Sequence, residues 1–188
     1  MDEKLVVAVI AGTKREKRES IKAARYVAEI GRTLPNVEVL FVDPADIELP
    51  PDGAPEDGRN PAFSEVTAKA DAFFIVTPEY NHSFPGSLKR LLDSEFENYF
   101  RKPVAIAGVS SGNWGGARAV EALWPVVRCM HMLSVRAELY FPRVQDLFGD
   151  GGQLKPEHAE AYAATTKRVY DDLLWHAKAL KWGRENLS

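Results

Sequence analysis

Cysteine is nearly missing from this sequence, since Cys129 is the only one in 188 residues. A lone thiol cannot form an internal disulfide, which argues against the disulfide-rich scaffolds of secreted proteins. No run approaches the roughly 20 consecutive apolar residues of a membrane span. The start MDEK precedes only a short apolar stretch, unlike a signal peptide. The net charge of -3 disfavours nucleic acid or an anionic membrane as partner. We therefore expect a cytoplasmic protein that binds neither.

Two phosphate-binding signatures are also missing. The chain contains neither G-x-G-x-x-G, the mark of a dinucleotide cradle, nor the P-loop pattern G-x-x-x-x-G-K-[ST]. His131, His158 and His176 are far apart and lack the spacing of metal ligands. The sequence therefore predicts no metal site.

Short runs of Val, Ile, Ala and Phe recur along the chain and predict strands. Residues 5–12, 37–43, 70–78 and 103–112 form four such runs, three of them almost continuously apolar. This pattern is typical of parallel strands that are covered by helices on both faces. A fifth run, residues 134–142, alternates more and ends at Pro142, which predicts an edge strand.

The segments between these runs show helical spacing of apolar residues. We expect helices over 20–34, from Pro85 to Phe96, over 117–132 and over 156–182. Pro125 should bend or interrupt the third of them, and Cys129 should pack in the core. The stretch 44–61, rich in Pro, Gly and Asp, reads as a long surface loop. The alternation predicts one α/β domain over residues 1–188, a three-layer, doubly wound fold around a parallel five-stranded sheet.

In such folds, ligands bind beyond the C-terminal ends of the strands, near the point where strand order reverses. Three loops of unusual composition occupy that edge. The first, GTKREKRES (12–20), offers a tight turn at Gly12, the Thr13 hydroxyl, and Arg15 and Arg18 for phosphate contacts. It suits a single phosphate monoester; an ordinary solvated loop is the alternative.

The second loop, TPEYNHSFPG (77–86), combines Pro78, Tyr80, Asn81 and Pro85. It offers a flat, hydrogen-bonding surface for a planar heterocycle, or else it is a plain strand-to-helix turn. The third loop, VSSGNWGGARA (109–119), has three glycines that let backbone amides approach a ligand. Such donors would stabilise a ring that becomes anionic on reduction; a simple glycine-rich turn is the alternative.

At these residues the chain resembles the NAD(P)H-dependent FMN reductase family of flavodoxin-like proteins, which includes quinone, azo-dye and chromate reductases. The resemblance runs from about Lys4 to Trp182. The family pattern Gly-Ser-x-Arg stands here as residues 12–15, with Thr13 in place of Ser. Pro-Glu-Tyr-Asn stands as residues 78–81, and Ser-x-Gly-x-x-Gly-Gly as residues 110–116.

The resemblance implies FMN as cofactor, its phosphate in the first loop and its isoalloxazine ring against the other two. The implied cofactor-binding residues are Thr13, Arg15, Arg18, Ser20, Pro78, Glu79, Tyr80, Asn81, Ser110, Ser111, Gly112 and Asn113. NADH or NADPH would pass a hydride to the flavin, and a quinone, azo compound, metal oxyanion or free flavin would then take the electrons by a ping-pong mechanism. The cofactor carries the difficult chemistry, so no side chain is expected to be a catalytic acid, base or nucleophile.

The resemblance also implies a homodimer or homotetramer whose subunits complete each other's sites. The aromatic residues Phe96, Tyr99, Phe100 and Trp124 exceed what one helix face needs for its core, so we expect some of them to bury against another subunit. The alternative function is a flavodoxin-like electron-transfer or redox-sensing FMN protein that acts on a protein partner.

Overall fold

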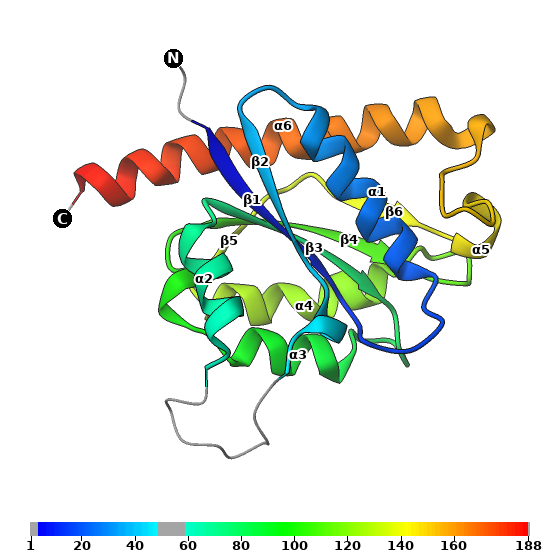
Figure 1. Cartoon of the computed structure of the whole chain (residues 1–188), viewed down its shortest axis with the longest axis horizontal. Coiled ribbons are helices and arrows are strands. Elements are labelled where there is room, and N and C mark those ends of the chain that lie inside the picture. The colour runs from blue at the N-terminus through cyan, green and yellow to red at the C-terminus, as the bar shows by residue number, and fades with distance from the viewer. Residues whose placement is uncertain (1–3, 49–58, 188) are drawn as a thin grey trace.

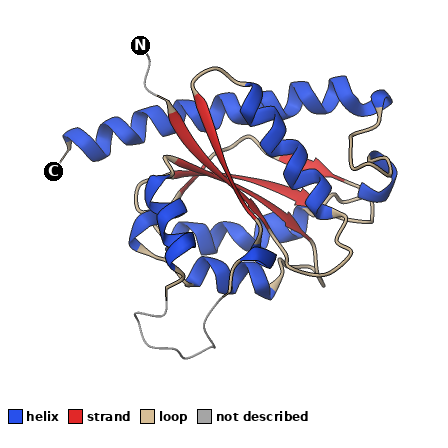
Figure 2. Ribbon diagram, viewed as in Figure 1, coloured by secondary structure: helices blue, strands red, loops and turns tan. Residues whose placement is uncertain are grey.

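The computed structural model describes residues 4–48 and 59–187. Its centre is a parallel sheet in the order β2-β1-β3-β4, with two short strands, β5 and β6, both paired to β4. The strands are β1 (Leu5–Ala11), β2 (Val37–Val42), β3 (Ala72–Pro78), β4 (Pro103–Val109), β5 (Leu133–Ser134) and β6 (Leu139–Phe141). Figure 2 shows the strands as a layer between helices.

Helices cover both faces of this sheet (Figure 1). On one face lie α1 (Ser20–Thr33) and α6 (Pro156–Asn186), which contact each other. On the other face lie α2 (Pro61–Lys69), α3 (Gly86–Asp93) and α4 (Ala117–Cys129). The short elements are η1 (Pro44–Asp46), η2 (Glu97–Tyr99) and α5 (Val144–Leu147). None of the helices in the described ranges is both long and apolar enough to cross a membrane.

The central strands are buried on both faces, which explains their continuous apolar sequence. Every residue of β3 and of β4 is buried. Because side chains alternate along a strand, Phe74 packs toward Tyr170 of α6 with ring centroids 5.2 Å apart, whereas Phe73 packs toward Tyr99 on the opposite face at 5.3 Å. The predicted three-layer α/β fold with a doubly wound parallel sheet is confirmed.

Three predicted elements need correction. The stretch 44–61 is not all loop, because residues 44–46 form η1 and Pro61 begins α2; residues 49–58 lie outside the described residues. The edge strand over 134–142 is two pieces, β5 and β6, which pair with opposite ends of β4. The helix α4 continues through Pro125, so the proline does not end it.

Two predicted side-chain placements and one predicted helix end also differ. Cys129 is exposed rather than in the core, because Leu123 and Val127 take the buried face of α4. Phe96 lies beyond the end of α3 and is 48% exposed. Tyr99 is fully buried in the protein's own core, so it is not available to another subunit.

Candidate functional site at the carboxyl edge of the sheet

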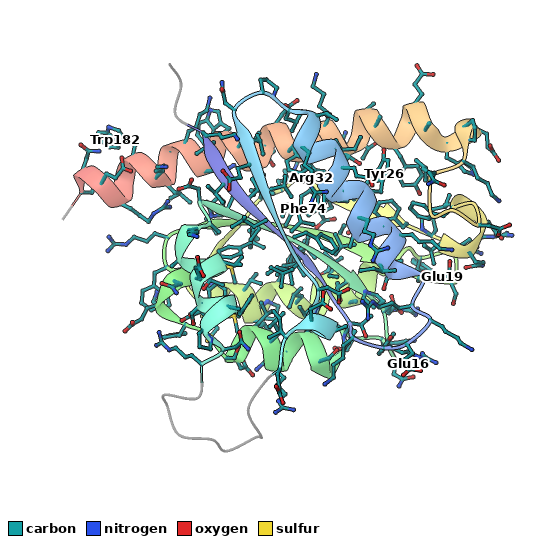
Figure 3. The ribbon with its side chains drawn as sticks, viewed as in Figure 1. Glu16, Glu19, Tyr26, Arg32, Phe74 and Trp182 are labelled. Atoms are coloured by element: carbon teal, nitrogen blue, oxygen red, sulfur yellow. The ribbon has the colours of Figure 1, made fainter. Side chains whose placement is uncertain are left out.

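The three predicted loops leave adjacent strands at one edge of the sheet. β1 pairs with both β2 and β3, and β3 pairs with β4. The next strand along the chain, β2, lies on one side of β1, and the strand after it, β3, lies on the other side. The strand order therefore reverses between β1 and β3. This is where doubly wound proteins bind ligands. Glu16 and Glu19 mark the first loop in Figure 3.

Gly12 begins the first loop in direct contact with β3. Its amide donates to the Val76 carbonyl at 2.8 Å, and a Cβ at this position would lie 2.6 Å from the Cα of Thr77. Only glycine allows this approach without displacing β3. The path of the first loop is therefore set against the strand that carries the second loop.

Thr13 and Arg15 connect the first loop to the second. The buried Thr13 hydroxyl accepts a hydrogen bond from the Arg15 amide at 3.2 Å and lies 3.2 Å from the Tyr80 hydroxyl. The Arg15 guanidinium carbon lies 5.8 Å from the centroid of the Tyr80 ring, within cation–π range. Arg15 is exposed and its guanidinium has no ion pair within the described ranges. Its charge therefore stays available to an anion.

Arg18 has a different set of partners. One nitrogen of its guanidinium forms an ion pair with Asp43, and another donates to the Arg15 carbonyl at 3.4 Å. Asp43 follows β2 directly and also accepts from the Ala45 amide at 2.9 Å. The Nε of Arg18 is buried and has no acceptor among the described residues. Much of the Arg18 charge is thus balanced within the protein, while one donor remains unused.

The second loop closes in a tight turn. Tyr80 and Ser83 exchange two backbone hydrogen bonds of 2.8 and 3.0 Å. Between them Asn81 and His82 have φ of +49° and +66°, the left-handed pair that defines a type I′ turn. Asn tolerates this conformation better than most residues. Asn81 and His82 are exposed at the tip.

Glu79 joins the second loop to the third loop and to α4. Its amide donates to the Val109 carbonyl at 2.9 Å. Its Oε1 accepts from the Nε of Arg118 at 2.6 Å and lies 2.5 Å from a second nitrogen of that guanidinium. Its side chain is only 7% exposed, and Oε2 has no donor among the described residues. The carboxylate therefore fixes the loop to the start of α4 and keeps one unused acceptor.

The third loop folds back against the end of β4. The Ser110 hydroxyl donates to the Gly112 carbonyl at 2.9 Å, and the Gly112 carbonyl also accepts from the Arg143 amide at 2.9 Å. Gly116 has a φ of +86°, and a Cβ there would lie 2.4 Å from the Val109 amide nitrogen. Ser111 and Asn113 are exposed.

Unused backbone donors gather at this edge. Within the described part of the chain, the amides of residues 13, 14, 16 and 17 in the first loop and of residues 111–114 in the third have no hydrogen-bond acceptor. Such amides bind anions and stabilise developing negative charge. A cavity of about 580 Å³ adjoins the first loop, between Lys14, Pro44 and the first turn of α3. In residues 4–48 and 59–187, no cluster of three His, Cys, Asp or Glu side chains could hold a metal ion.

The structure thus joins Thr13, Arg15 and Tyr80 directly, and it pairs the neighbouring Glu79 with Arg118 of α4. It places Arg18 against β2, and Ser20 is buried in the first turn of α1. Asp43 and Arg118 were missed by the sequence reasoning. Asp43 could have been found, because it is a charged residue directly after a strand that ends at the same edge of the sheet.

Comparison with known proteins identifies the class. A flavodoxin-like α/β fold is shared with a flavoenzyme NAD(P)H:acceptor oxidoreductase, FerB of Paracoccus denitrificans. The match has a TM-score of 0.72 and 22% identity, and it covers 92% of this chain and 98% of that one. At this identity the likeness supports the fold alone.

Sequence relatives carry the identification further. The family model described as NADPH-dependent FMN reductase matches residues 5–146. A quinone reductase of Pseudomonas putida is 31% identical over 161 residues, covering 79% of this chain and 83% of the relative. An NAD(P)H-dependent FMN reductase of Pseudomonas aeruginosa is 31% identical over 168 residues, covering 85% and 89%.

The chain therefore belongs to the NADPH-dependent FMN reductase family. This confirms the family expected from the sequence, the oxidoreductase class, and FMN with NAD(P)H as the cofactor and co-substrate of the family.

Proposed function

We propose that this protein binds FMN across the three loops, oxidises NAD(P)H and reduces a small acceptor such as a quinone. The observation that carries the proposal is the set of contacts that joins Thr13, Arg15 and Tyr80 across the first and second loops. Glu79, next to Tyr80 in the chain, pairs with Arg118 of α4. Around these contacts lie the unused amides of the first and third loops. The cytoplasm, where NAD(P)H is the common reductant, is the compartment that this reaction favours.

The residues at the site fit FMN. A phosphate monoester needs donors and a positive charge, which the free amides of the first loop and the exposed Arg15 supply. The Nε of Arg18 is an unused buried donor beside them. The remaining predicted site residues lie in these loops or at the ends of the elements beside them: Ser20, Pro78, Asn81, Ser110, Ser111, Gly112 and Asn113. When bound, FMN supplies hydride acceptance and electron transfer to the second substrate.

The protein's own contribution is positioning and charge stabilisation. Tyr80 and the turn that follows it form a shelf whose orientation is fixed by Thr13 and by the Tyr80–Ser83 pair. The amides of residues 111–114 offer donors for negative charge that develops on a reduced ring. If both substrates use the same binding position beside the cofactor, the nicotinamide product would have to leave before the acceptor binds. We infer a ping-pong order with no side chain as acid, base or nucleophile.

The test starts with the visible absorbance of the FMN-loaded protein. Addition of NADH or NADPH should bleach it, and a quinone should restore it. Initial rates at several quinone concentrations should give parallel double-reciprocal lines. Steady turnover with a small acceptor also separates an enzyme from an electron carrier that serves a protein partner. Failure to retain FMN, or no oxidation of either nucleotide, would end the proposal.

Arg15→Gln probes the phosphate contact. It should weaken FMN binding by about 10- to 100-fold, since a hydrogen bond to a charged group contributes roughly 1.5–3 kcal/mol. Arg25→Gln, which removes the same charge from an exposed position on α1, is the matched control. Isothermal titration with FMN measures both. Equal losses in the two variants would indicate general electrostatics rather than a phosphate contact.

We also propose that the protein is a homodimer or homotetramer. Phe96 is 48% exposed and packs edge-on against Phe100, with ring centroids 4.9 Å apart. Beside them is a cavity of about 470 Å³, whose lining combines apolar residues with three charged ones: Phe96, Pro125, Val126, Cys129, Met130, Lys89, Asp93 and Glu95. An apolar patch of this kind on an α3–α4 face supports burial against a second subunit.

A further inference from the structure

A third cavity lies at the edge of the sheet, beside β6. Its volume is about 830 Å³, and it lies between residues 136–140, which lead into β6, and residues 161–172 of α6. None of the predicted cofactor-binding residues lines it. Its size falls in the range of small-molecule sites, roughly 300–1,000 Å³.

The wall of this cavity is held by specific hydrogen bonds. Asp172 of α6 accepts from the Ala137 amide at 3.1 Å, and the Tyr162 hydroxyl donates to the Tyr140 carbonyl at 3.2 Å. The Tyr162 ring stacks on Phe141 of β6, with centroids 5.0 Å apart and an interplanar angle of 15°. These contacts satisfy backbone groups at the sheet edge and fix the Tyr162 ring beside the cavity.

The charged groups in the wall are not equivalent. Asp172 already accepts from Ala137 and lies 3.3 Å from the Nδ1 of His176. Glu138 accepts from the Tyr140 hydroxyl, and burial together with this hydrogen bond raises the pKa of Tyr140. Tyr140 therefore stays protonated and keeps donating to Glu138.

The two arginines of the wall are in the opposite situation. Arg136 and Arg168 are exposed residues that line the cavity. Neither has a hydrogen bond or an ion pair with any residue in the described ranges. Their guanidinium groups are therefore available, whereas the two carboxylates are engaged in building the wall.

We propose that this cavity binds a small organic phosphate that carries a flat ring. Arg136 and Arg168 would hold the phosphate, because the planar guanidinium fork matches its oxygens in pairs. Tyr140, Tyr162 and the apolar side chains of Leu139 and Ala161 would receive the ring. The volume exceeds what an inorganic ion needs, which favours the larger ligand.

The experiment is isothermal titration of the FMN-loaded protein with three probes: adenosine 5′-monophosphate, ribose 5-phosphate and inorganic phosphate. We expect adenosine 5′-monophosphate to bind most tightly, with a several-fold loss when the ring is absent. The double variant Arg136→Gln/Arg168→Gln should weaken its binding by at least about tenfold. The Arg25→Gln control should bind it unchanged. FMN content is measured on every variant to verify the fold.

Several outcomes would overturn the inference. They are no binding of adenosine 5′-monophosphate, equal binding of all three probes, or unchanged binding by the double variant. Displacement of the probe by NADP⁺ from the double variant as well as from the unmodified protein would place the probe in the NAD(P)H site instead. The inference does not rest on the proposed reductase activity. If the protein held no FMN and still bound the probe through Arg136 and Arg168, the inference would stand while the proposed function failed.

Discussion

At the scale of single residues, Thr13 is the most informative position of the site. Its buried hydroxyl serves both the Arg15 amide and the Tyr80 hydroxyl. Thr13→Val keeps the shape and removes both hydrogen bonds, so the first loop loses its contact with the Tyr80 shelf. We expect FMN binding to weaken by about tenfold, the effect of roughly one net hydrogen bond.

The control for this change is Thr13→Ser, which keeps the hydroxyl. It should bind FMN within about threefold of the unmodified protein, since little beyond a methyl group is lost. Fluorescence titration of FMN measures both variants. Identical affinities for the Val and Ser variants would show that the hydroxyl does not organise the site.

A second residue-scale prediction concerns Lys102, which is buried beside α2. Its ammonium donates to the carbonyls of Thr67 and Ala68 at 2.8 and 3.3 Å. Burial, helped by the charge of Arg184, lowers the pKa of Lys102 to about 8, although Asp71 and Glu95 oppose the shift. An unfolded chain has an ordinary lysine pKa of about 10.4.

The sign of the effect follows from these two values. Between about pH 8 and 10 the unfolded chain holds a proton that the folded protein has released, so stability rises with pH in this window. The free energy of unfolding rises by on the order of 1–3 kcal/mol across this pH window. Lys102→Met should flatten this rise, while Lys178→Met, an exposed lysine of α6, should preserve it. Urea unfolding at pH 7.5 and 9.5 measures the change in the free energy of unfolding for each protein. The same change in the unmodified protein and in both variants would contradict the prediction.

Residue by residue, the sequence predicted which loop residues lie close together better than it predicted their ion-pair partners. Thr13, Arg15 and Tyr80 were expected at one site, and the structure brings them together. The partners of Arg18 and Glu79 were not foreseen, because Asp43 and Arg118 lie 25 and 39 positions away in the chain. Which charges pair across such distances depends on loop paths that local pattern does not determine.

At the scale of elements, segments with a clear apolar pattern were predictable, and a helix without one was not. β1, β3 and β4 are buried on both faces and read as apolar blocks. The helix α2 has only nine residues and follows a stretch rich in Pro and Gly, so its start was hidden. Its local signals are nevertheless present: Asn60 caps it by accepting from the Phe63 amide at 3.0 Å, and Pro61 opens it.

The junction of β4 with α4 gives an element-scale prediction. Gly116 has a left-handed φ of +86°, and any Cβ there would lie 2.4 Å from the Val109 amide nitrogen. Gly116→Ala must therefore shift the third loop away from β4. We expect a loss of about 1–3 kcal/mol in the free energy of unfolding, from strain together with displaced packing.

Gly86→Ala is the matched control, because no atom lies within 4 Å of a Cβ at that position. It opens α3, where alanine is the better helix former, so stability should not fall. Thermal unfolding without FMN separates this packing effect from cofactor binding. A Gly116→Ala variant as stable as the Gly86→Ala variant would show that the junction can relax.

At the scale of the whole molecule, the fold buries two apolar clusters, one on each face of the sheet, and leaves a few large apolar side chains outside. They lie on different elements. Phe96 lies next to the apolar cavity at α3 and α4, whereas Trp182 lies on α6, near the C-terminal end of that helix (Figure 3). The single-domain organisation over residues 1–188 stays a prediction.

This distribution leads to the last prediction, which concerns assembly. Phe96→Asp places a charge in the centre of the proposed subunit interface, where it would have to be buried without a partner. We expect the dissociation constant of the oligomer to rise at least tenfold, so that sedimentation velocity at micromolar concentration shows mainly monomer. Trp182→Ser removes a side chain that is 60% exposed and should leave assembly unchanged.

If Trp182→Ser dissociates the oligomer and Phe96→Asp does not, the subunits meet along α6, and the patch at Phe96 must have another use. If FMN affinity falls together with assembly in the Phe96 variant, the second subunit also contributes to holding the cofactor. Retained affinity in the monomer would instead show that the three loops of one chain suffice.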